Sequence, residues 1–192
     1  RFVENHPFQK LFELYIMDDG ENKPNQERLL NEKIEEVLHD FDVVLVTDYG
    51  HGMIGPQAAD LLCSKSKFLA INTQLNAGNL GFNTVSKYPR ADFICVSENE
   101  IRLEARSRRK ELRDIVLDVA GQLSCNNVMV TQGPQGSLNY CPEEGFIKVP
   151  ALATKVIDRV GAGDTVFSVA SLLAALKAPN EIIGFVGNVA GA

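Results

Sequence analysis

Short apolar runs alternate with longer amphipathic segments along most of this sequence. Residues 42–47 (DVVLVT) are apolar between their ends, and further apolar runs cover residues 68–71, 93–96 and 128–130. Such runs are typical of parallel strands covered on both faces, and strands that alternate with helices imply right-handed crossovers. The sequence therefore predicts an α/β fold with three layers, in which helices cover both faces of a mostly parallel sheet.

Apolar residues at helical spacing indicate where the helices lie. Leu30, Ile34, Val37 and Leu38 recur on one helix face, and their charged neighbours read as its solvated side. Further helices are predicted at residues 56–66, from residue 98, at residues 112–123, after residue 163 and at residues 181–188.

The remaining segments have the composition of strands and loops. Residues 1–3 and 8–17 are rich in aromatic and branched side chains and read as strands at the edge of a sheet. A polar loop is predicted over residues 18–26, and a hairpin-like pair over residues 137–140 and 146–149.

Length and charge limit the class of protein. A chain of 192 residues with 45% hydrophobic content can bury a sizeable core and suits one α/β domain. The formal charge of −6 and a pI near 5.1 argue against nucleic acid or an acidic membrane as the main partner. Neutral or phosphorylated small molecules fit better.

Cysteine spacing and the lack of long apolar runs indicate the compartment. Cys63, Cys95, Cys125 and Cys141 include no Cys-x-x-Cys pair, so they read as reduced, buried thiols and not as a zinc site or a disulfide framework. No apolar run approaches membrane-spanning length and no signal peptide is visible, so we expect a cytoplasmic protein.

Both ends of the sequence fall inside predicted elements. The chain opens at Arg1 without a methionine and enters strand-like residues at once, and it stops at Ala192 inside the helical pattern that begins at Glu181. We therefore expect a fragment of a longer protein.

The stretch Asp158–Phe167 (DRVGAGDTVF) joins a glycine turn to an apolar helix. The free N–H groups of a helix N-terminus, carried on small residues, form an anion site, and Asp164 puts a carboxylate beside it. Asp164 then either caps the helix or serves as a base next to a phosphoryl group. A dinucleotide-binding fingerprint does not fit, because the position of its third glycine is occupied by Val166.

Polar residues follow the predicted parallel strands, where ligands bind in such sheets. Residues 131–137 (TQGPQGS) can border a nucleotide's phosphates and ribose, or form a tight turn that needs glycine. Glu100 can reach Mg²⁺ through water, or complete a capping box with Ser97.

The residues after two further strands could likewise either bind a ligand or stabilise the local loop. Asp48 can bind sugar hydroxyls or a metal-bound water, or can simply form a turn. The asparagines of residues 72–83 can hydrogen-bond a polyol, or stabilise an irregular loop.

In combination, the Gly-Ala-Gly-Asp helix start, the Thr-x-Gly-x-x-Gly turn and the Glu-bearing turn resemble the ribokinase-like (PfkB) carbohydrate kinases. Residues 42–52, which end in Asp-Tyr-Gly-x-Gly, look most like the heptose 7-phosphate kinase branch that feeds ADP-heptose synthesis. The resemblance implies one ribokinase-like kinase domain fragment over residues 1–192, with lid strands at 1–17 and a nucleotide-binding core at 27–192. The family's N-terminal third would be absent.

The resemblance also implies roles for individual residues. Asp164 would be the general base, and the anion hole would be Gly161, Ala162 and Gly163. The ATP site would be lined by Thr131, Gly133, Gly136 and Asn188. Glu100 would support magnesium, and Asp48 and Asn72 would contact the sugar.

Partners are implied in the same way. Edge strands in the lid region imply a homodimer. Enzymes of the heptose branch are often fused to a nucleotidyltransferase, but the His-x-Gly-His motif of such a partner is absent from this sequence.

Two departures from the family pattern keep other functions open. Ser97 stands where the family has Asn in its Asn-x-x-Glu motif, and residues 72–74 (NTQ) stand where the heptose kinases have Asp-Pro-Lys. The alternatives are a noncatalytic kinase-like sensor of a sugar or nucleotide, and a nucleoside kinase on the same scaffold. We expect the fragment alone to be inactive.

Overall fold

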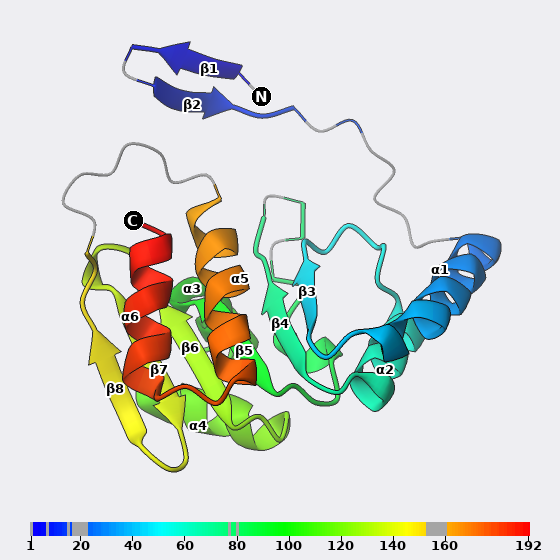
Figure 1. The fold of residues 1–192 in the computed structure, drawn as a ribbon. Coiled ribbons are helices and arrows are strands. Elements are labelled where there is room, and N and C mark those ends of the chain that lie inside the picture. The colour runs from blue at the N-terminus through cyan, green and yellow to red at the C-terminus, as the bar shows by residue number, and fades with distance from the viewer. Residues whose placement is uncertain are drawn as a thin grey trace.

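A computed structural model of the chain describes residues 2–6, 8–14, 16, 23–76, 78–79, 81–152 and 161–192, arranged as two sheets with helices (Figure 1). The strands are β1 (Phe2–Asn5), β2 (Phe8–Phe12), β3 (Val44–Asp48), β4 (Leu69–Thr73), β5 (Phe93–Ser97), β6 (Asn127–Thr131), β7 (Ser137–Cys141) and β8 (Gly145–Val149). The α-helices are α1 (Pro24–Val37), α2 (Pro56–Lys65), α3 (Glu98–Glu104), α4 (Leu112–Gln122), α5 (Ala162–Ala175) and α6 (Asn180–Ala190). Short 3-10 helices are η1 (Leu38–Asp40), η2 (Val85–Lys87) and η3 (Gly133–Gln135).

The larger sheet has the order β3-β4-β5-β6-β7-β8. Strands β3 to β6 are parallel to their neighbours, and β7 and β8 continue the sheet as an antiparallel pair. The predicted mostly parallel sheet and the predicted hairpin-like pair are both confirmed. The carboxyl ends of the four parallel strands therefore share one edge of the sheet.

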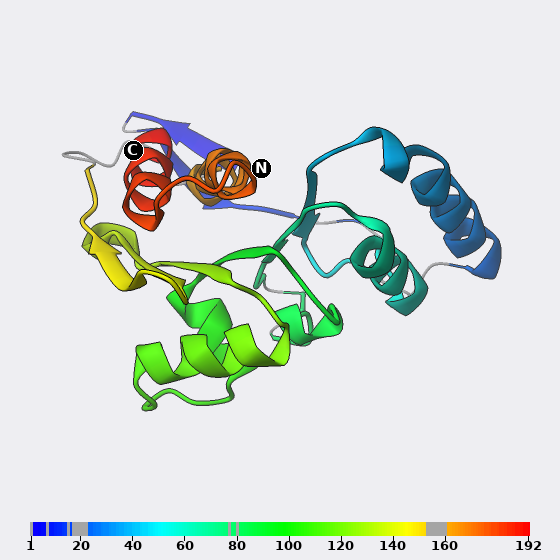
Figure 2. The same ribbon diagram turned by 60° about the horizontal axis from the view of Figure 1, so that its bottom comes forward.

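Alternate residues of the central strands enter two separate cores. Ile71 and Ile94 pack with side chains of α2, α3 and α4, whereas Ala70, Phe93 and Met129 pack with α5 and α6. Figure 2 shows α5 and α6 on one side of the sheet and α4 on the other. The predicted three layers are confirmed, and β4 is buried along its whole length, as a strand covered on both faces should be.

Strand β3 is less buried than the other parallel strands. In the described part of the chain it is an edge strand of the larger sheet, and Val44 and Leu45 are only half-buried while Thr47 is exposed. Each face still contacts a core, because Val44 and Val46 pack with one cluster and Leu45 with the other. An apolar run shows that a strand forms but not where the strand lies in the sheet.

The N-terminal strands form their own antiparallel sheet, separate from the larger one (Figure 1). The rings of Phe2 and Phe12 stack with centroids 4.3 Å apart. Two strands were expected here and are confirmed, but they are not an edge of the larger sheet. The second strand ends at Phe12, so Leu14 and Ile16 lie outside it and are exposed.

Helix boundaries follow the prediction closely, with one correction at α1. Residues 24–26, expected in a loop, form its first turn. Pro24 fits a helix start because the first turn needs no N–H donor, and the Gln26 side chain accepts a hydrogen bond from the Lys23 N–H at 3.1 Å.

The cysteines are free and buried, as predicted. Burial raises the pKa of the Cys95 and Cys125 thiols to about 12, which keeps them protonated and unreactive. Among the described residues, no helix has both the length and the apolar character needed to cross a bilayer.

Candidate active site

The N-terminus of α5 is open and rigidly held. Gly161 precedes the helix with a φ of 83°, a left-handed conformation that favours glycine. Among the described residues, a side chain added at Gly161 or Gly163 would meet nothing within 4 Å, so the backbone N–H groups here can be approached closely. Phe167 is fully buried one turn later, which fixes the helix on the sheet. The predicted residues 158–160 lie outside the described residues.

Asp164 is the third residue of α5, and the N-cap position belongs to Gly161. The alternative that Asp164 caps the helix therefore does not apply. Its carboxylate instead accepts hydrogen bonds from two other loops: the Gln74 amide Nε2 donates to Oδ1 at 2.5 Å, and the Tyr49 hydroxyl donates to Oδ2 at 3.3 Å. Tyr49 follows β3 and Gln74 follows β4, so the parallel strands bring both donors to the same helix end.

The loop after β4 holds these two donors in place. The Asn79 side-chain amide is buried and donates to the carbonyl oxygens of Tyr49 at 3.0 Å and of Gln74 at 2.8 Å. Asn83 donates to the carbonyl oxygen of Asp48 at 2.9 Å. These amide donors bind the protein's own backbone, which favours the irregular-loop interpretation over binding of a polyol.

Asp48 is buried and is held from the opposite side of the sheet to Asp164. Its Oδ2 accepts from Lys87 Nζ and from the Tyr88 hydroxyl, both at 2.7 Å, and its Oδ1 accepts from the Gly50 N–H at 2.9 Å. Burial, and then the negative charge of Asp48, raise the pKa of Tyr88. These contacts are those of the turn-forming alternative, and contact between Asp48 and a sugar remains a prediction.

Asn72 occupies the corresponding end of β4 and is also buried. Its side-chain N–H donates to the carbonyl oxygen of Cys95 at 2.7 Å, while its Oδ1 has no hydrogen-bond partner among the described residues. A buried carbonyl oxygen without a partner is costly, so this atom has acceptor capacity to offer a ligand.

Glu100 completes the capping box that its spacing from Ser97 predicted. Oε2 accepts from the Ser97 N–H at 2.6 Å, and Oε1 accepts from the Leu75 N–H at 3.0 Å. Glu100 therefore joins the start of α3 to the loop after β4 that carries Gln74.

The residues predicted to bind the nucleotide lie close together where β6 ends and the turn to β7 begins. Thr131 ends β6, Gly133 and Gly136 have positive φ in the following turn, and the turn leads into β7. The Asn188 side chain on α6 donates to the carbonyl oxygens of Val149 at 3.3 Å and of Pro150 at 3.2 Å. A Cβ atom at Gly136 would lie 2.0 Å from the same Val149 oxygen. Helix α6 and the turn after β6 therefore both lie against the end of β8.

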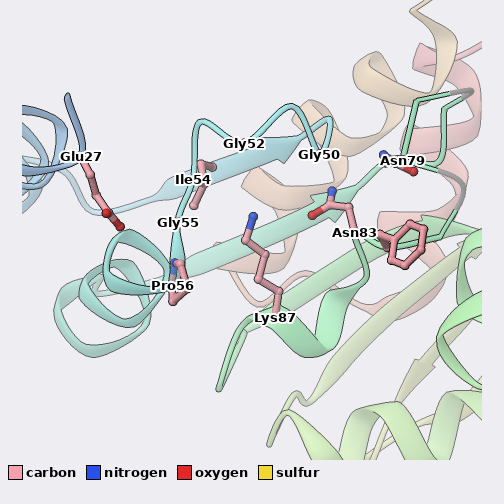
Figure 3. A pocket seen from close by; sticks show the side chains of 10 residues that line it. Glu27, Gly50, Gly52, Ile54, Gly55, Pro56, Asn79, Asn83 and Lys87 are labelled. Carbon is pink, nitrogen blue, oxygen red and sulfur yellow. The ribbon is translucent and has the colours of Figure 1, made fainter. Parts of the chain in front are cut away.

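A cavity of about 270 Å³ lies on the other side of the Asp48 loop (Figure 3). Glu27 lies at one end, Asn79 at the other and Lys87 between them. Its lining includes neither Asp164 nor any residue of α5, and it shares Asn79 and Lys87 with the contacts around Asp48.

Residues 58–192 match the family described as pfkB family carbohydrate kinase. The chain belongs to this family.

Curated relatives of this pfkB family chain are similar over part of their length. The bifunctional protein HldE of Citrifermentans bemidjiense is 27% identical over 154 residues, which are 79% of this chain and 31% of the relative. HldE of Campylobacter curvus is 28% identical over 158 residues, 81% of this chain and 33% of the relative. The chain thus spans about a third of the length of these relatives.

Solved structures show that the fold is ribokinase-like. The tetrameric inhibited form of phosphofructokinase-2 from Escherichia coli has a TM-score of 0.73 at 17% identity, covering 89% of this chain and 57% of that chain. Ribokinase from Arabidopsis thaliana, complexed with ribose and ATP, has a TM-score of 0.65 at 17% identity, covering 83% and 51%.

The sequence analysis assigned no role to three residues of the site. Tyr49 and Gln74 contact Asp164, and Lys87 forms an ion pair with Asp48. Tyr49 and Gln74 follow the carboxyl ends of β3 and β4, so the strand-end rule applied to their segments but did not single them out. Lys87 lies 39 residues from its partner and carries no local signal.

Replacing Lys87 by Met should destabilise this pfkB family domain by about 3 kcal/mol, because it leaves the buried Asp48 carboxylate without its cation. Adding Asp48→Asn to Lys87→Met should restore part of the loss, since the unpaired charge is gone. Urea unfolding measures both. The matched control is Lys33→Met, which breaks an exposed ion pair with Glu36 and should cost less than about 1 kcal/mol. If Lys87→Met and Lys33→Met lowered the free energy of unfolding equally, the structural role of Lys87 would be contradicted.

Replacing Gly136 by Ala should cost about 3 kcal/mol or more, because the new Cβ would overlap the Val149 carbonyl at a φ of 89°. Gly133→Ala is the control in the same turn: its φ of 56° is strained for alanine, but no described atom lies within 4 Å. We expect about 1 kcal/mol for that variant in the same unfolding measurement. A similar cost for both would show that Gly136 does not require this close approach.

Proposed function

We propose that this pfkB family chain carries the phosphoryl-transfer part of an enzyme that phosphorylates a sugar or sugar phosphate with ATP. The observation that carries the proposal is the position of the Asp164 carboxylate. It lies in the first turn of a helix whose inner face packs on the sheet, next to the exposed Gly161 and Gly163 and above the carboxyl ends of β3 and β4.

In this mechanism, Asp164 takes the proton from the acceptor hydroxyl as that oxygen attacks the γ-phosphorus of ATP. The N–H groups of Gly161, Ala162 and Gly163 stabilise the negative charge on the transferring group. Phosphoryl transfer depends mainly on positioning and charge stabilisation, which a rigid helix end supplies without reorganisation. Thr131, Gly133, Gly136 and Asn188 line the ATP that delivers the group.

The residues present fit magnesium as an ion that ATP brings. Each oxygen of Glu100 accepts one backbone hydrogen bond and keeps a lone pair for a water molecule on the ion. No cluster of three His, Cys, Asp or Glu residues suited to direct ligation occurs in the part of the chain that the structure describes. Magnesium would be held by phosphate oxygens and water, and would neutralise phosphate charge.

The acceptor we propose is a heptose 7-phosphate-like sugar phosphate. The support comes from the HldE relatives and from fold neighbours solved with ribose and with fructose-6-phosphate. Asn72 and Asp48 are proposed to contact this sugar, and the unpartnered Oδ1 makes Asn72 the better supported of the two. By the same resemblance we propose a cytoplasmic homodimer whose complete chain includes a nucleotidyltransferase.

One observation favours a second candidate, a noncatalytic kinase-like sensor of a sugar or nucleotide. Ser97 and Asn72 depart from the family's patterns, and the Asn72 amide donates to the Cys95 carbonyl oxygen and not toward an open site. The test is a screen for ADP release by the complete gene product, over heptose, hexose and pentose phosphates and nucleosides. Saturable ligand binding without ADP release from any acceptor would favour the sensor, and turnover of nucleosides alone would indicate a nucleoside kinase.

Asp164→Asn should lower kcat by at least about 1,000-fold while ATP binding stays within about two-fold, because the amide cannot take a proton. ADP release measures turnover, and calorimetric titration measures ATP affinity. Asp60→Asn on the exposed side of α2 is the control and should behave as wild type. Near-normal turnover of Asp164→Asn would refute the base assignment.

A further inference from the structure

We infer that Gln74 is the positioning residue of the base: it holds Oδ1 of Asp164 so that Oδ2 receives the proton of the acceptor. The inference rests on the proposed function and assigns a role to a residue at which this chain departs from the Asp-Pro-Lys pattern of the heptose kinases. The group that touches the substrate is Asp164, and Gln74 acts through it.

The two hydrogen bonds on Asp164 differ in a way that separates their roles. The Gln74 contact to Oδ1 comes from a half-buried side chain. The Tyr49 contact is long, at 3.3 Å, and comes from a side chain that is 40% exposed. Each carboxylate oxygen accepts one of these hydrogen bonds and keeps a lone pair, so an acceptor hydroxyl approaches most easily at Oδ2, the oxygen whose donor side chain is the more exposed.

The backbone of Gln74 is fixed at both of its polar groups. Its N–H donates to the Asp48 carbonyl oxygen at 2.9 Å, and its carbonyl oxygen accepts from the buried Asn79 amide at 2.8 Å. The side chain therefore starts from a defined position between β3 and β4. A base held this way presents its other oxygen in one direction, which is what near-attack geometry requires.

The proton has one consistent route in this arrangement. The acceptor O–H bond breaks as its proton passes to Oδ2 of Asp164, and the oxygen forms a bond to the γ-phosphorus of ATP. The bond from that phosphorus to the bridging oxygen breaks, and ADP leaves with its electron pair. The Gln74 amide neither gives nor takes a proton, so its hydrogen bond to Oδ1 persists throughout.

Charge makes the identity of residue 74 matter. A cation at this position would stabilise the carboxylate and weaken it as a base, whereas the neutral amide orients Oδ1 without an ion pair. A carboxylate at the same position would lie within hydrogen-bonding distance of Asp164, and two such groups share a proton. Gln74→Met and Gln74→Glu therefore perturb the base in different, measurable ways.

The test compares steady-state kinetics of the complete gene product with an acceptor found by the ADP screen. Gln74→Met should lower kcat by about 10-fold to 100-fold with the ATP KM within about two-fold, because the base is misoriented while ATP still binds. Gln74→Glu should move the acid limb of the kcat–pH profile up by about one pH unit or more. Tyr49→Phe should lose less kcat than Gln74→Met, because the hydrogen bond from Gln74 to Oδ1 is kept. Gln122→Met at the exposed end of α4 is the matched control.

Wild-type kinetics for Gln74→Met overturn the inference, as does an unmoved pH profile for Gln74→Glu, which keeps the side-chain shape. A kcat loss for Tyr49→Phe equal to that of Gln74→Met would assign the anchoring role to Tyr49 instead. If the wild type releases no ADP, the proposed function fails and NMR still tests the contact. The Gln74 side-chain amide signal, identified by its loss in Gln74→Met, should then shift in Asp164→Asn, and an unmoved signal overturns the contact.

Discussion

The packing of α5 on the sheet is the contact on which the candidate site depends. Phe167 and Ala170 are fully buried against the face formed by Ala70, Phe93 and Met129. Because the helix cannot rock on this close-packed surface, its N-terminus stays above the ends of β3 and β4. The parallel register of those strands then decides which loops reach it, so helix packing and strand direction together fix where Asp164 lies.

Most strands of the larger sheet could be predicted from the sequence, because the central strands are buried on both faces. For β4, β5 and β6, burial selects continuous apolar runs that are visible without any knowledge of partners. At β3 the same kind of run predicted the strand but not its position at an edge of the sheet, since that position depends on the neighbouring strands and not on its own residues. The N-terminal strands show the same limit: β-rich composition predicted them, but their pairing into a separate sheet is a tertiary property.

The site was predictable where its signal is local. The glycine turn before α5 and the capping box of Ser97 and Glu100 are short patterns with a direct physical reason, and both occur as expected. The contacts of Asp164 with Gln74 and Tyr49 join residues that are 90 and 115 positions apart in the sequence. No local sequence pattern around any of the three residues predicts these contacts. The asparagines after β4 were ambiguous for a related reason: a short amide serves a ligand or its own loop equally well until its neighbours are known.

The wide separation of these partners along the chain has a consequence for the order of folding. Strands β6, β7 and β8 follow one another through short turns, so they close small loops and can pair early. The contact between Tyr49 and Asp164 closes a far larger loop and requires β3, β4 and α5 all to be in place. We expect the end of the fold that carries the candidate site to be assembled last, after the rest of the sheet has formed.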